Sequence, residues 1–241
     1  MRRVTNNTKV KWFLAVLTAT VVGCPQQVVI PPPGGDSLVR DDFDGTLQAG
    51  WSIDASSDAD VDLSPRTGFA RLLPPESPDP SVQTTMTLLL RDMDGDFVLV
   101  TRMEFQTITD WQLSGLVIKG DDGHIVAIGL FSASGDRGSI RGLGLRADRG
   151  PDVDPGRAFA AFDLDNVYLR LERAGDRYKG SYSRDGVAFT VVGELTNDLS
   201  DHVRVGIGTA ADTRCSMNCD QRAPADFDFF EILAPNASSG S

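Results

Sequence analysis

The fold is decided by residues 167–191, which read VYLRLERAGDRYKGSYSRDGVAFTV. Apolar and polar residues alternate along this stretch, and the alternation is broken at 174–176 and at 185–186, where glycine stands beside aspartate. Asp-Gly between two alternating runs is a strong signal for a two-residue type I′ hairpin. The stretch therefore predicts three antiparallel strands joined by two hairpin turns, with Tyr182 facing Phe189.

The register of these strands follows from their alternation, because a slip of one residue would move every side chain to the other face. An even loop near 174–176 keeps the apolar residues together, whereas an odd loop would oppose leucines to Arg177 and Lys179. One face is therefore predicted to be buried, and it holds Leu169, Leu171, Tyr178, Tyr182, Phe189 and Val191. The opposite face is polar, either solvated or lining a binding surface, and it holds Tyr168, Arg170, Glu172, Arg177 and Lys179.

The rest of residues 37–234 shows the same short alternating runs between turn signals, and no amphipathic helix of 12 residues or more. About a dozen strands in one region without a long linker predict a single all-β domain, an antiparallel two-sheet sandwich. The predicted strands are Leu38–Phe43, Phe69–Leu73, Gln83–Arg91, Phe97–Phe105, Gln112–Lys119, Ile125–Phe131, Ile140–Arg146, Val167–Arg173, Arg177–Ser183, Ala188–Val192, Val203–Thr209 and Asp226–Leu233.

Residues 167–176 and 182–186 resemble the "LRL-R-G-D … YS-DG" stretch of concanavalin A-like jelly-roll domains. They are similar to the C-terminal modules of family 43 β-xylosidases and to related bacterial laminin-G-like domains of unknown function. One departure is Phe189, where tryptophan is common. The resemblance implies that the first and last strands are neighbours, so that Asp42 and Asp228 lie in paired segments. The other matching pieces are residues 41–45 with Trp51, residues 115–118 with 121–123, and residues 227–232.

Composition excludes several classes of function. The net charge of −11 disfavours nucleic-acid binding, because phosphates are repelled. The two histidines, His124 and His202, leave little material for a histidine-based metal site or triad. Glucanases of the resembled fold carry a Glu-x-Asp-x-Glu triplet, which places two carboxyl groups for glycoside hydrolysis. The chain has no such triplet, so we predict that it is not an enzyme.

The N-terminus predicts export and lipid attachment. Four cations precede an apolar stretch, 12–22, that is too short to span a bilayer. The stretch ends in Val22-Gly23-Cys24, which resembles the bacterial lipoprotein box, in which the cysteine thiol carries a diacylglyceryl group. An ordinary secretory signal with a chance cysteine is the alternative. We therefore predict a signal peptide over 1–23, a lipid on Cys24 and a membrane as partner through that lipid.

Between the lipid and the domain, residues 24–36 contain Pro31-Pro32-Pro33-Gly34-Gly35 and predict an extended tether. Residues 235–241 predict a disordered tail. Pro25 lacks the aspartate that retains lipoproteins in the inner membrane, so the outer membrane or the cell surface is the predicted location.

For function, the resemblance implies a glycan-binding lipoprotein, and the candidate ligand residues are Trp51, Trp111 and Tyr168, with Arg170 as polar partner. Aromatic faces stack on sugar rings, and polar side chains bind the hydroxyl groups. Core packing is the competing interpretation for both tryptophans. A structural or protein-interaction domain of the envelope is the alternative function, and a glycan hydrolase is a third.

Calcium occurs in concanavalin A-like domains, which makes Asp42 and Asp228 candidate ligands of a structural ion. Two further acidic clusters, 54–62 and 92–96, are interpreted as a solvated loop and a hairpin turn, because the second lacks the bidentate acid that a calcium loop requires. Cys215 and Cys219 are separated by three residues, and in an oxidising compartment we predict a disulfide between them. Free thiols or a metal pair are the alternative.

Overall fold

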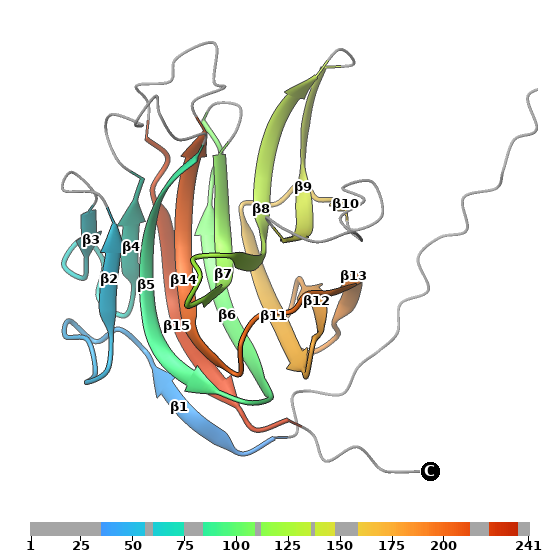
Figure 1. Cartoon of the computed structure of the whole chain (residues 1–241). Helices are drawn as coiled ribbons and strands as arrows, with labels where there is room; N and C mark the ends of the chain where they lie inside the picture. Colours follow the sequence, from blue (N-terminus) through green and yellow to red (C-terminus); the bar gives the residue numbers. More distant parts are fainter. Residues whose placement is uncertain are drawn as a thin grey trace, which may run out of the picture.

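We describe a computed structural model of the chain, which covers residues 35–55, 60–74, 84–108, 112–135, 138–147, 159–212 and 222–235. Across these ranges the regular elements are all strands. No helix capable of crossing a bilayer occurs among the described residues. The strands pair antiparallel in two sheets, which lie face to face (Figure 1). Residues 24, 111, 215 and 219 fall outside the described ranges, so the predictions on these cysteines and this tryptophan stay predictions.

The eight-stranded sheet has the order β13 (Thr190–Thr196), β12 (Arg177–Ser183), β11 (Asn166–Ala174), β6 (Phe97–Phe105), β15 (Ala225–Leu233), β4 (Ala70–Leu73) and β3 (Asp60–Asp62), and β1 (Ser37–Asp41) also pairs with β15. The seven-stranded sheet has the order β10 (Phe159–Ala161), β9 (Gly138–Ala147), β8 (Ile125–Gly135), β7 (Gln112–Gly120), β14 (His202–Asp212), β5 (Thr84–Asp94) and β2 (Ser52–Ala55).

All twelve predicted strands are present, with bounds that differ by a few residues. The three strands that the sequence did not predict are β2, β3 and β10, each of three or four residues and each at the end of a sheet. So short a strand shows too little alternation to be recognised, and the prediction relied on alternating runs between turn signals. The neighbouring placement of β1 and β15 is confirmed, since Arg40 pairs with Glu231 and Asp41 with Phe230.

The core lies between the sheets and is built from every second residue of the central strands. Leu89, Leu116, Ile128 and Ile207 contribute from the seven-stranded sheet, and all four are fully buried. The opposing sheet contributes Leu99, Leu169, Leu171, Phe227 and Phe230. This arrangement confirms the all-β, two-layer fold.

The β11–β12 hairpin has the predicted even loop, because Ala174 pairs with Arg177 across Gly175-Asp176. Leu169 therefore lies opposite Tyr182 on the inner face.

The predicted two-residue turn at Asp185-Gly186 is wrong. Tyr182 pairs with Thr190 instead of Phe189, and Gly180 pairs with Gly193. A longer loop is favoured because the Ser183 hydroxyl accepts hydrogen bonds from the backbone N–H groups of residues 185 and 186, while the Asp185 carboxylate accepts them from residues 187 and 188. As a result Val192 packs in the core, while Val191 shares the outer face with Ser181.

This loop gives a first testable prediction. The backbone N–H groups of Ala188 and Val187 and the Ser183 hydroxyl lower the pKa of Asp185 to about 2. We expect the carboxyl carbon signal of Asp185 in NMR to titrate near that pH, and the loop to loosen only as the pH falls from the ordinary value of about 3.9 towards it. A midpoint at the ordinary value would show that the carboxylate does not close this loop.

Candidate functional site

The outer face of the seven-stranded sheet carries a row of glycines across four strands. Gly208 of β14 pairs with Gly115 of β7, Gly115 pairs with Gly129 of β8, and Gly129 pairs with Gly144 of β9. We call these four residues the glycine row. Because paired residues of neighbouring strands point to the same face, the row forms a band without side chains of its own, perpendicular to the strands. The four glycines are buried, and the side chains of Leu88 and Leu113 lie beside Gly208 and Gly129.

Close approach of β7 and β8 requires glycine at two positions of the row. A Cβ atom on Gly115 would overlap the carbonyl oxygen of Ile128, and one on Gly129 would overlap the carbonyl oxygen of Ser114. A Cβ on Gly208 would collide with the side chain of Leu88. At Gly115 and Gly129 the band is therefore built into the packing of the strands, whereas at Gly208 the end of the Leu88 side chain occupies the space that a Cβ would take.

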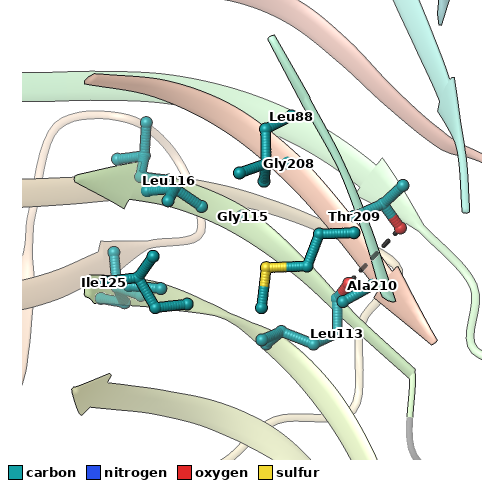
Figure 2. A pocket seen from close by; sticks show the side chains of 12 residues that line it. Leu88, Leu113, Gly115, Leu116, Ile125, Gly208, Thr209 and Ala210 are labelled. Atoms are coloured by element: carbon teal, nitrogen blue, oxygen red, sulfur yellow. Dashed lines mark hydrogen bonds between the residues drawn. The ribbon is translucent and has the colours of Figure 1, made fainter. Parts of the chain in front are cut away.

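Apolar side chains surround Gly115 and Gly208 of the glycine row and make a shallow hollow. Figure 2 shows Leu88, Leu113 and Ile125 around the positions of Gly115 and Gly208, on strands β5, β7, β8 and β14. The hollow is also lined by Met86, Val117, Ala127 and Ala210.

Phe131 of β8 stands directly opposite Leu113 and is half-buried. The exposed guanidinium of Arg146 lies 5.9 Å from the centre of the Phe131 ring. This ring extends the apolar surface beyond the hollow.

A charged bridge lies beyond Ile125 on the same face. The Oδ2 atom of Asp54 on β2 accepts hydrogen bonds from Lys119 Nζ of β7 at 2.7 Å and from Arg204 Nη2 of β14 at 2.9 Å. The hydrogen bond from Lys119 and the two positive charges lower the pKa of Asp54, although partial burial opposes them. Strands β14 and β5 lie between β7 and β2, so the bridge passes over the outer surface of both. Leu90, on the outer face of β5, has no exposed surface.

The candidate ligand residue Trp51 serves the core. Its indole Nε1 donates a hydrogen bond to the buried Asp41 carboxylate at 2.8 Å. Its ring packs edge-on against Phe230, with the two ring centres 5.0 Å apart. The same carboxylate accepts the backbone N–H of Phe43 and of Gln48. Core packing, the competing interpretation, is therefore the one that the structure supports for Trp51.

The face predicted to be either solvated or lining a binding surface is buried at Arg170. Its side chain is only 1% exposed, and the nearest aromatic ring, Phe189, lies 6.0 Å from the guanidinium carbon. Burial lowers the pKa of this guanidinium. Tyr168 is half-buried, and its ring packs on Gly186. Tyr168 and Arg170 lie on the eight-stranded sheet, away from the glycine row, so the structure does not bring them together with it.

The two candidate calcium ligands are each paired with an arginine. Asp42 contacts Arg40 at 2.7 Å, and Asp228 contacts Arg102 at 3.0 Å. Asp228 lies at a bulge in β15, where the pairing with β6 shifts between Phe227 and Phe229. The described residues contain no group of three or more histidine, cysteine, aspartate or glutamate side chains arranged to hold a metal ion.

Two antiparallel sheets packed with these connections define a concanavalin A-like jelly-roll sandwich. The chain belongs to the family of β-xylosidase C-terminal concanavalin A-like domains, whose model matches residues 40–233. The domain is thus of a carbohydrate-associated class, related to the C-terminal modules of glycoside hydrolase family 43.

Individual proteins agree with this assignment. A xylan 1,3-β-xylosidase from a Vibrio species is 29% identical over 215 residues, which cover 83% of this chain and 38% of the enzyme. Among solved structures, a xylan β-1,4-xylosidase from Bacillus halodurans has a TM-score of 0.57 at 21% identity, covering 81% of this chain and 39% of that one. Bacteroides ovatus xyloglucan PUL GH43B has a TM-score of 0.59 at 19% identity, covering 82% and 39%. The chain therefore spans about two fifths of the length of these relatives.

Proposed function

We propose that the protein is a non-catalytic, exported lipoprotein that binds polysaccharide on the outer face of the seven-stranded sheet. The observation that carries the proposal is the glycine row with its apolar surround, in a domain whose family accompanies xylosidases. The basic N-terminal region and the lipobox-like Cys24 support export and anchoring, with the outer membrane or the cell surface as the location.

The shape of the glycine row suits a linear sugar chain. Neighbouring strands are about 4.8 Å apart, so a row across four strands is roughly 14 Å long, enough for about three pyranose rings. The row has no side chains of its own, so the flat apolar face of a ring can lie low over the sheet against Leu88 and Leu113, and Ile125 excludes water from its edge. The exposed half of Phe131 offers a further stacking surface.

The lining of the hollow supports a binding role. Glycoside hydrolysis generally needs two carboxyl groups on either side of the scissile bond. No described residue that lines the hollow is an aspartate or a glutamate. Release of reducing sugar from a polysaccharide by the purified protein would overturn this part of the proposal.

Replacing Phe131 by alanine tests the binding face. We expect the Phe131→Ala variant to bind its polysaccharide roughly tenfold more weakly, because aromatic contacts contribute on the order of 1 kcal/mol beyond burial. The measurement is affinity electrophoresis of the full-length protein in gels that contain xylan or another soluble polysaccharide identified on a glycan array.

Phe229→Ala is the matched control. Phe229 is also half-buried on an outer face and also has an arginine, Arg40, over its ring, but it belongs to the eight-stranded sheet. Its replacement is expected to leave binding unchanged. If the wild-type protein binds no polysaccharide, the proposal fails and a structural or protein-interaction domain becomes the better interpretation. Equal losses in both variants would place the ligand elsewhere.

A further inference from the structure

We propose that Lys119 and Arg204 form a binding site for the carboxylate of an acidic sugar, and that Asp54 occupies this site in the free protein. The inference rests on the proposed function, because it names the class of glycan that the same face would select. A uronic acid residue in the bound chain would place its carboxylate where the Asp54 carboxylate now lies.

The two cations require an anion between them. Lys119 and Arg204 are direct cross-strand partners on one face of β7 and β14, and like charges directly opposite each other destabilise a sheet. One oxygen of Asp54 binds both, so a single negative charge is shared by two positive charges. Asp92, Asp94 and His202 lie together on the same face, with His202 Nδ1 at 2.9 Å from Asp94 and Asp92 opposite Arg204. Arg146 also lies on this face, near Phe131.

Asp54 is held in a way that permits exchange. It belongs to β2, a four-residue strand that pairs only with β5 among the described strands. Its side chain is 34% exposed, and the side chains of Lys119 and Arg204 are 20% and 33% exposed. Partly exposed ion pairs contribute about 1 kcal/mol or less, so a ligand carboxylate can displace this one at small cost.

The bridge is continuous with the proposed binding face. Ile125, which lines the hollow, pairs directly with Lys119, and Val117 lies two residues away on the same side of β7. A sugar chain over the hollow could therefore extend one substituent to the two cations. In a chain of net charge −11, much of the surface repels a carboxylate, and two adjacent cations on one face offer it a place to bind.

The test compares a soluble polyuronate with the same polymer after chemical reduction of its carboxyl groups to alcohols. In Asp54→Asn the two cations lose their internal partner, and we expect the full-length protein to bind the polyuronate about tenfold more tightly, with binding of the reduced polymer unchanged. Combined replacement of Lys119 and Arg204 by methionine should abolish the preference for the polyuronate. Asp163→Asn, which removes an exposed partner of Arg184, is the matched control and should change neither affinity.

A second measurement covers the case in which a variant fails to fold. In the wild-type protein, D-glucuronate should shift the side-chain nitrogen signals of Lys119 and Arg204 in NMR, and D-glucose should not. Unchanged signals, or equal binding of the polyuronate by Asp54→Asn and wild type, would overturn the inference. Binding of neutral polysaccharides alone would overturn it too while leaving the proposed function intact, whereas binding of no polysaccharide at all would remove both.

Discussion

The Arg173→Met variant is expected to lose about 3–5 kcal/mol of the free energy of unfolding, because a buried guanidinium that donates four hydrogen bonds to backbone carbonyl groups would be removed. Arg173 of β11 is 3% exposed. Its Nε donates to the carbonyl oxygen of Gly175, its Nη1 to that of Asp201, and its Nη2 to those of Leu199 and Ser200 at 3.3 and 2.8 Å.

These hydrogen bonds tie the β13–β14 connection to the β11–β12 turn. Methionine preserves much of the packing volume but donates no hydrogen bond. The buried carbonyl groups would therefore be left without a hydrogen-bond donor. Urea unfolding monitored by circular dichroism would measure the loss, as a lower midpoint with an unchanged slope. A variant as stable as the wild type would show that water or another donor replaces the guanidinium.

Arg170→Met is the matched control on the same strand. Arg170 is equally buried on the opposite face, but its Nε and Nη1 have no hydrogen-bond partner, and Glu172 lies at 3.2 Å from Nε without suitable hydrogen-bond geometry. Replacing a poorly paired buried charge by an apolar side chain of similar volume is neutral or stabilising, here by about 0–2 kcal/mol. Opposite effects of the two substitutions on the free energy of unfolding would show that hydrogen bonding, and not burial alone, makes Arg173 stabilising.

The fold could be predicted from the alternation of apolar and polar residues, because this pattern shows which face of each strand is buried. The bounds of β6 and β12 were predicted to the residue, and the pairing of Leu169 with Tyr182 followed from the choice of an even loop. The Asp185-Gly186 turn was predicted wrongly because hydrogen bonds from Ser183 and Asp185 side chains favour a longer loop, and alternation does not register such bonds.

The candidate site was harder to predict because its main feature is the absence of side chains. Gly142-Leu143-Gly144 was visible in the sequence, but only the pairing of β9 with β8 shows that Gly144 continues a row. Glycine at alternate positions, as at Gly206 and Gly208, is a signal that could have been used, since it marks one bare face of a strand. Trp51 was predicted as a ligand residue because it is aromatic. Its hydrogen bond to Asp41 could not be predicted from the spacing of residues in the sequence.

Gly115→Ala is expected to cost about 3 kcal/mol or more, because the added methyl group meets backbone that cannot move alone. The carbonyl oxygen of Ile128 would be overlapped, and the Cα atom of Gly129 would lie 2.6 Å from the new Cβ. Strands β7 and β8 would have to separate, which disturbs their hydrogen bonds on both sides of the row. For a domain of this size the melting temperature should fall by roughly 6–12 °C.

Gly120→Ala, in the same strand, separates this effect from the general cost of altering a glycine. The nearest atoms to its added Cβ are the ends of two side chains, Asp122 Oδ1 at 3.0 Å and Leu199 Cδ2 at 3.1 Å, and both can shift. We expect its stability to change by about 1 kcal/mol or less. Differential scanning calorimetry of the two variants measures both melting temperatures. Equal melting temperatures would show that the close approach of β7 and β8 at the glycine row does not limit the stability of the sheet. If only Gly115→Ala falls, the bare band that the proposed ligand needs is also a condition for the sheet to form.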